Sequence, residues 1–121
     1  MPNVQTNLER LRNLDGYLGA ALVDSESGMT LGMDGTGGGI NLEVAAAGNT
    51  EVVRAKRKAM RNLGIKDEIE DILISLGKQY HILRPLRARA GVFYYVALDR
   101  TRANLAMARM TIADTEKALE V

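Results

Sequence analysis

The chain has 121 residues, of which 46% are hydrophobic and 26% charged, a balance typical of a globular domain and too apolar for intrinsic disorder. Sixteen basic and fifteen acidic residues leave a net charge of +1, so no strong overall field would recruit nucleic acid or an anionic membrane. The sequence contains no cysteine, which excludes disulfides, thiolate metal ligands and cysteine nucleophiles and is compatible with a reducing compartment.

No segment approaches the roughly 20 apolar residues of a membrane span, and the first residues lack the apolar run and cleavage site of a signal peptide. We therefore expect one domain over residues 1 to 121, in the cytoplasm and without membrane insertion. Arginine outnumbers lysine, and alanine and glycine are abundant, which favours a bacterial source.

The first third of the chain predicts a helix and a hairpin. Apolar residues recur at helical spacing over residues 4 to 14. Two apolar runs, at 17 to 24 and 29 to 33, flank a polar turn that ends in Gly28, which is the pattern of a β-hairpin. The sequence DGTGGG at 34 to 39 has the most flexible composition in the chain and predicts a loop.

A long helix is predicted over residues 42 to 63, with Asn41 as its N-cap and Gly64 just past its end. On a helical wheel, Lys56 and Asn49 interrupt an apolar face, and basic residues gather on the opposite side. The apolar face comprises Leu42, Ala45, Val52, Val53, Met60 and Leu63, and the basic arc comprises Arg54, Arg57, Lys58 and Arg61.

Three further strands and a last helix are predicted after the long helix. Short connections join the strands, as an antiparallel meander requires. The last strand is apolar or aromatic on both faces, which predicts a central place in the sheet, and Asp99 or Thr101 would cap the final helix. The whole pattern predicts an α+β sandwich, with a five-stranded antiparallel sheet in the order α-β-β-α-β-β-β-α. The three strands after the long helix cover residues 69 to 76, 79 to 86 and 91 to 98, and the last helix covers about 101 to 119.

The glycine-rich stretch offers a possible nucleotide site that fails on inspection. Gly32 and Gly37 have the G-x-x-x-x-G spacing of a phosphate loop, but Gly38 and Gly39 follow where that loop needs lysine and serine or threonine. The dinucleotide pattern G-x-G-x-x-G fails because Ile40 occupies the place of its last glycine. We therefore predict no cofactor.

No arrangement of residues predicts a metal site or an active site. His81 is the only histidine, and no carboxylates accompany it at ligand spacing. Asp67, Glu68, Glu70 and Asp71 lack the glycine and the spaced oxygen donors of a calcium loop. No nucleophile lies in a recognisable elbow, so we predict no catalytic residues and no enzyme activity.

Basic side chains gather at the arc on the long helix and at the turn after the second strand of the meander. No aromatic residues suited to base stacking accompany either group, so solvated surface is favoured over a nucleic-acid interface. The second group is Arg84, Arg87 and Arg89.

Two features predict an interface with another protein. Lys56 and Asn49 would be costly in a monomer core, so this face either meets a partner or leaves the lysine stem packed at the helix edge. The strand containing Ile72, Leu73 and Ile74 is expected at the sheet edge, where it could pair with a second copy. One of Ile72 and Ile74 would then face the interface.

Five sequence blocks make the chain similar to a known family. They are LDGYLGAALVD at 14 to 24, VRAKR at 53 to 57, DEIEDILISLG at 67 to 77, QYHILRPL at 79 to 86, and YVALDRTRANL at 95 to 105. In order and spacing, the chain resembles the roadblock/LC7, or dynein-light-chain-like, family, and in particular its short single-domain bacterial members.

The resemblance implies a profilin/longin-like sandwich with the long helix on one face of the sheet and the two terminal helices on the other. It implies a homodimer formed through residues 44 to 63 and 69 to 76. Family members are non-catalytic platforms that bind small Ras-like GTPases, sometimes as activators, or act as adaptors. Bacterial relatives often work beside a small GTPase and a sensor-kinase-like ATPase. Our candidate interface residues are Val52, Lys56, Ala59, Met60, Leu63, Ile69, Asp71, Ile72, Leu73 and Ile74, and the candidate GTPase-docking residues are Arg54, Arg57, Lys58 and Arg61.

The leading hypothesis is thus a homodimeric regulator or scaffold for a small GTPase. The alternative is a small-molecule-sensing module of a signalling pathway, with its ligand between helix and sheet. The small residues Gly19, Ala20, Ala21, Ala45 and Ala46 favour close packing over such a pocket.

Overall fold

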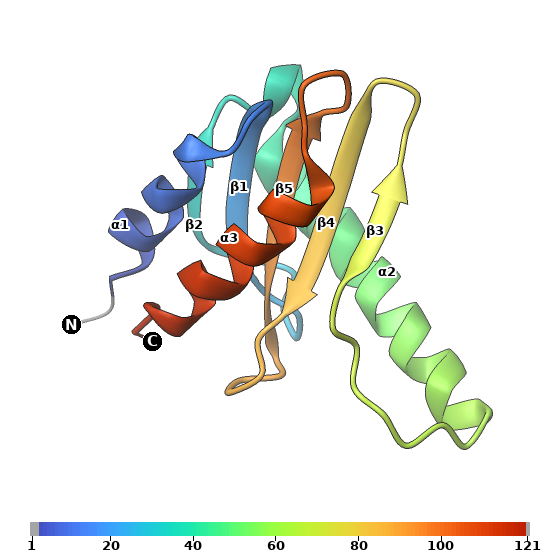
Figure 1. The fold of residues 1–121 in the computed structure, drawn as a ribbon. Helices are drawn as coiled ribbons and strands as arrows, with labels where there is room; N and C mark the ends of the chain where they lie inside the picture. Colours follow the sequence, from blue (N-terminus) through green and yellow to red (C-terminus); the bar gives the residue numbers. More distant parts are fainter. Residues whose placement is uncertain (1–2, 121) are drawn as a thin grey trace.

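The computed structural model describes residues 3 to 120 and shows a five-stranded antiparallel sheet between two layers of helices (Figure 1). The strand order is β2-β1-β5-β4-β3, so β5 lies at the centre and β3 at an edge, as the sequence predicts. In chain order the elements are α1 (Val4–Glu9), the 3-10 turn η1 (Arg10–Asn13), β1 (Tyr17–Asp24), β2 (Thr30–Gly35), the 3-10 turn η2 (Gly37–Gly39), α2 (Leu42–Asn62), β3 (Ile72–Ser75), β4 (Gln79–Pro85), β5 (Val92–Asp99) and α3 (Leu105–Lys117).

The two faces of the sheet bury separate apolar cores. Successive side chains of a strand point to opposite faces, so Tyr94 and Tyr95 are both fully buried but in different cores. Leu8 of α1, Leu11 of η1 and Ile112 of α3 cover one face, whereas α2 covers the other. The predicted placement of the long helix opposite the two terminal helices is confirmed.

Strand β3 is shorter than the predicted strand over residues 69 to 76. Ile72 pairs with Leu83, and every second residue of a strand bonds to the same neighbouring strand. In this register, the residue two positions before Ile72 would therefore have to bond to Pro85. Proline has no backbone N–H to donate, and the ladder therefore ends at Ile72. Residues 64 to 71 form a long connection without helix or strand.

The hairpin of β1 and β2 contains a bulge. Leu22 pairs with Gly32, whereas Val23 pairs with Thr30, which leaves Leu31 as the extra residue on β2. Leu31 is exposed at this outer strand. The strand continues to Gly35, further than the sequence predicts.

The stretch from Asp34 to Gly39 is not the flexible loop that its composition predicts. Its first two residues end β2, and η2 then folds against β1. A Cβ atom on Gly19 would lie 2.8 Å from the Gly37 nitrogen, so the two backbones are in direct contact. The glycines thus permit the close approach of the two backbones and a positive φ of 69° at Gly37. Composition alone does not show whether glycines serve such a fixed geometry or make a loop mobile.

Helix α3 starts later than predicted and has a different cap. The Asn104 side chain, not Asp99 or Thr101, accepts the hydrogen bond from the Met107 N–H, at 3.1 Å. The Asp99 carboxylate instead accepts hydrogen bonds from the backbone N–H and the hydroxyl of Thr101, at 3.0 and 2.8 Å. These bonds shape the turn that leads from β5 to the helix.

The carboxylate of Asp34 joins η1 to the hairpin. It accepts hydrogen bonds from Arg12 Nη2 at 2.6 Å and from the Tyr17 hydroxyl at 2.7 Å. Asp34 is only 5% exposed. The Arg12 guanidinium, followed by the Tyr17 hydroxyl, holds the pKa of Asp34 below its usual range.

Replacing Asp34 with Asn is expected to lower the free energy of unfolding at neutral pH by about 2 kcal/mol, because two charge-assisted hydrogen bonds weaken. Since the folded-state pKa is depressed, this contribution is present above the unfolded pKa of about 4 and is lost as pH falls through the folded value. Urea unfolding at neutral and acidic pH measures the difference. The exposed Asp15→Asn serves as control, and a difference independent of pH would contradict the assignment.

Candidate functional site

The sheet covers only the first part of α2. The buried residues of the helix are Leu42, Ala46, Thr50 and Val53, and none follows Val53. Figure 1 shows the remaining turns running past the strands before the chain returns to β3. The second half of α2 therefore has a surface that the described part of the chain leaves uncovered.

The predicted apolar face of α2 does not coincide with its buried face. Counted at about 100° per residue, the centre of the strip of buried residues lies roughly 65° around the helix axis from the centre of the predicted apolar face. Lys56 is exposed, and Leu63 is 71% exposed. The apolar face is thus wider than the sheet can cover, and Lys56 lies outside the core. Of the other candidate interface residues on α2, Val52 is exposed, and Ala59 and Met60 are partly exposed.

The edge of the sheet continues this uncovered surface. Ile72 and Ile74 are partly exposed, and both belong to the α2 face of the sheet. They alternate with Leu73, as strand geometry requires. We call the combined surface of Val52, Met60, Leu63, Ile72 and Ile74 the α2–β3 surface.

The remaining candidate interface residues lie elsewhere. Leu73 packs toward the core under the terminal helices. Asp71 accepts a hydrogen bond from Arg109 Nε of α3 at 2.9 Å, so its carboxylate is also on that side. Ile69 lines a hollow below the end of α2.

His81 lies on the α2 face of β4 and is held by neutral partners. Its Nε2 is 2.9 Å from Gln79 Oε1, and its ring meets Tyr95 edge-on with 5.3 Å between the ring centroids. Burial lowers the pKa of His81, which favours the neutral ring. Within residues 3 to 120, no three histidine, aspartate or glutamate side chains gather as metal ligands would.

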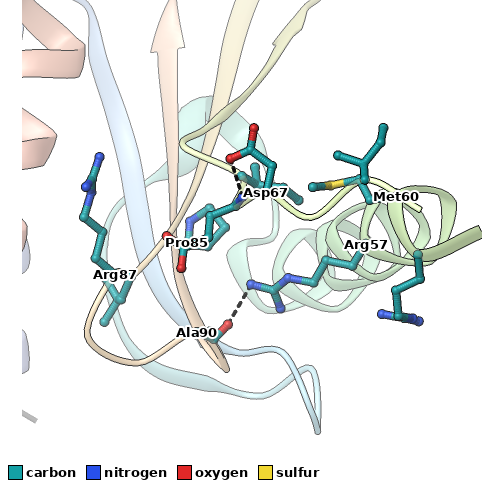
Figure 2. A pocket seen from close by; sticks show the side chains of 11 residues that line it. Arg57, Met60, Asp67, Pro85, Arg87 and Ala90 are labelled. Carbon is teal, nitrogen blue, oxygen red and sulfur yellow. Dashed lines mark hydrogen bonds between the residues drawn. The ribbon is translucent and has the colours of Figure 1, made fainter. Parts of the chain in front are cut away.

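The basic arc is not on the side opposite the sheet. Arg57 Nη2 donates a hydrogen bond to the Ala90 carbonyl at 2.7 Å, across a cavity of about 250 Å³ (Figure 2). Met60, Asp67 and Pro85 also line this cavity, from three different segments. The sequence does not predict it, because it depends on the β4–β5 turn lying beneath the end of α2. The other three basic candidates, Arg54, Lys58 and Arg61, are exposed.

Comparison with known proteins identifies the fold. No family model matches the chain, and no curated protein matches it either. Among solved structures, a roadblock/LC7 domain from Streptomyces avermitilis has a TM-score of 0.77 at 15% identity, over 91% of this chain and 88% of the other. The chain has the roadblock/LC7 fold. MglB of Myxococcus xanthus gives 0.75 at 17% identity, over 94% and 79%, and an MglB with a tetrameric arrangement gives 0.77 at 16%, over 93% and 82%.

These likenesses confirm the resemblance at the level of the roadblock/LC7 fold. The uncovered α2–β3 surface lies on the helix and edge strand that the resemblance singles out. No helix among the described residues 3 to 120 is both long and apolar enough to cross a membrane.

Proposed function

We propose that the protein is a non-catalytic regulator or scaffold, homodimeric and cytoplasmic, that binds a small Ras-like GTPase in a bacterial signalling system. The observation that carries this proposal is the uncovered α2–β3 surface on a roadblock/LC7 fold. A sensor-kinase-like ATPase acting beside the GTPase belongs to the same proposal.

A second copy is the proposed occupant of the α2–β3 surface. As an edge strand, β3 has unpaired backbone groups on one side, and apolar side chains adjoin it on α2. Pairing of β3 with its twofold equivalent would extend the sheet and bring the two α2 helices together. The tetrameric arrangement of one MglB supports self-association in this fold.

The exposed basic residues of α2 would then provide the docking charge for the GTPase. Arg54, Lys58 and Arg61 are exposed, whereas Arg57 is bonded to Ala90 in the free protein. Charges at the rim of an interface mainly accelerate association with an oppositely charged surface. Any effect on hydrolysis would come from reshaping the GTPase's own site.

Lys58→Glu and Arg61→Glu are expected to weaken binding of the cognate GTPase roughly tenfold each, mainly through slower association. Surface plasmon resonance with the GTP- and GDP-loaded forms of each small GTPase of the same genome measures this. Lys117→Glu, an exposed change on α3 at the other face, is the matched control. If none of these GTPases binds in either nucleotide state, the proposal is wrong.

The small-molecule sensor remains the second candidate because of the cavity beneath α2. Its volume of about 250 Å³ is below the roughly 300 Å³ at which ligand pockets begin. Ala20, Ala21 and Ala46 are fully buried, which is consistent with close packing between helix and sheet. A specific metabolite that raises the melting temperature in a thermal-shift screen would favour the sensor.

A further inference from the structure

Helix α2 carries a coiled-coil seam beside its buried strip. Six residues follow one another at alternating spacings of four and three, which is the pattern of the a and d positions of a heptad repeat. Val52 is 37% exposed and Leu63 is 71% exposed, so the described part of the chain leaves much of this seam open. The a positions are Asn49, Lys56 and Leu63, and the d positions are Ala45, Val52 and Ala59.

The flank of α2 opposite the seam lies against two turns of the sheet. A Cβ atom on Gly28, in the β1–β2 turn, would lie 3.7 Å from the Ala47 Cα, and Arg57 donates its hydrogen bond to Ala90 in the β4–β5 turn. Counted at about 100° per residue, Ala47 and Arg57 lie on average roughly 160° around the helix from the centre of the seam. The seam therefore faces away from both turns.

The seam is complementary to its own twofold image. In an antiparallel pair of helices, each a position packs against a d position of the other helix. When residue 54 is next to the twofold axis, all six positions of the seam have such a counterpart. A shift by one heptad in either direction leaves two of the six without one. The facing pairs are Leu63 with Ala45, Lys56 with Val52, and Asn49 with Ala59 of the second copy.

The axis of this helix pairing lies at the edge of the sheet. Val53 is the last buried residue of α2 and belongs to the same apolar core as Ile72 and Ile74 of β3. Residue 54 is thus next to the edge strand. One twofold axis can therefore relate both the two α2 helices and the two β3 strands, although the seam and the edge strand were located from different observations.

We propose that Lys56 and Asn49 fix this antiparallel register by bonding to each other between two copies. Lys56 takes part in no ion pair among residues 3 to 120, and Asn49 lies two turns, about 10.5 Å, away on the same helix. In the paired seam, the stem of Lys56 packs on Val52 of the second copy. The Asn49 amide oxygen of that copy is one turn further along, about 4.5 Å, where the lysine ammonium can donate to it.

Polar residues at a positions specify the register and orientation of a coiled coil at a cost in stability. Twofold symmetry forms the Lys56–Asn49 bond twice, whereas parallel helices would place the two Lys56 ammonium groups face to face. This inference rests on the proposed homodimer and names the residues that set its geometry. The basic arc is on the flank opposite the seam, so the pairing leaves the proposed GTPase-docking residues free.

The register is tested with single-cysteine variants of the full chain, which has no cysteine of its own. Ala45→Cys and Leu63→Cys, mixed and then oxidised, are expected to form a disulfide-linked dimer. Either variant alone should not, because its two equivalent residues would lie about 27 Å apart, beyond the reach of a disulfide. Self-linking of Leu63→Cys would indicate parallel helices. Linking of Val52→Cys to Leu63→Cys would indicate a shift by one heptad. Either result would overturn the proposal.

The role of the polar pair is tested by adding Lys56→Leu or Asn49→Leu to these variants. Neither side chain is in the core, so the fold should persist. The dimer should persist as well, but the link between positions 52 and 63 should increase roughly fivefold, the preference that one hydrogen bond provides. Lys58→Leu, an exposed change on the opposite flank, should leave all links unchanged.

Unchanged links in both the Lys56→Leu and the Asn49→Leu variants would show that the polar pair does not set the register. Analytical ultracentrifugation separates this inference from the proposed function. A dimer with the wrong links would contradict the register alone, whereas a monomeric protein would contradict the homodimer too. Binding of a GTPase to the basic arc is measured independently of both.

Discussion

Replacing Ile72 or Ile74 with Asp is expected to convert the proposed homodimer into monomers. Both side chains lie on the α2 face of the edge strand, where a second copy would bury them. Each substitution removes apolar contact and places an unpaired carboxylate in the interface. We expect the dimer dissociation constant to rise by roughly a hundredfold or more, measured by analytical ultracentrifugation.

Ser75→Asp is the matched control for this experiment. Ser75 is exposed on the same strand, but alternation points its side chain to the face of Leu73. This variant should remain dimeric. Circular dichroism melting separates a folded monomer from an unfolded chain. A folded Ile72→Asp and Ile74→Asp pair that both stay dimeric would show that copies do not meet at β3.

Glu116→Ala is expected to lower the free energy of unfolding by about 3 kcal/mol, and the melting temperature by roughly 10 °C. The change leaves the Arg84 guanidinium buried without its counter-charge and removes the acceptor for the Arg87 N–H. Thermal unfolding followed by circular dichroism measures the effect. Because the Glu116 carboxylate links α3 to the end of β4, the loss is also expected to loosen the helix.

Asp114→Ala provides a nearby comparison on the same helix. The Asp114 side chain is exposed and lies 4.0 Å from Lys117, so its removal should cost less than about 0.5 kcal/mol. Equal destabilisation by the two variants would mean that the Arg84–Glu116 pair contributes nothing specific to stability.

The order of the elements and the place of β5 follow from local sequence. Apolar residues on both faces of β5 require cover on both sides, and the short connections after β3 and β4 allow only an antiparallel meander. The early end of β3 has a signal in the sequence too, since Pro85 cannot extend the ladder. The proline marks the end of β3 only when the register of β3 against β4 is known, and a single sequence does not reveal that register.

The surfaces were harder to predict than the strands. A helical wheel locates the apolar side of α2 but cannot divide it between the sheet and a partner, so the strip that the sheet buries was misplaced. The ion pairs are separated in sequence by 22 residues for Arg12 and Asp34 and by 32 for Arg84 and Glu116. Such pairs depend on how helices pack on the sheet, and nothing in the local pattern indicates them.

The bulge at Leu31 bears on how far assembly could proceed. A dimer joined at β3 would form one continuous sheet with a β2 strand at each outer end. An unprotected outer strand could add further copies and grow into a filament. The extra residue interrupts the regular spacing of hydrogen-bonding groups on β2 and increases its twist. Polymerisation along the sheet is thereby disfavoured, and growth by strand pairing would close at two copies.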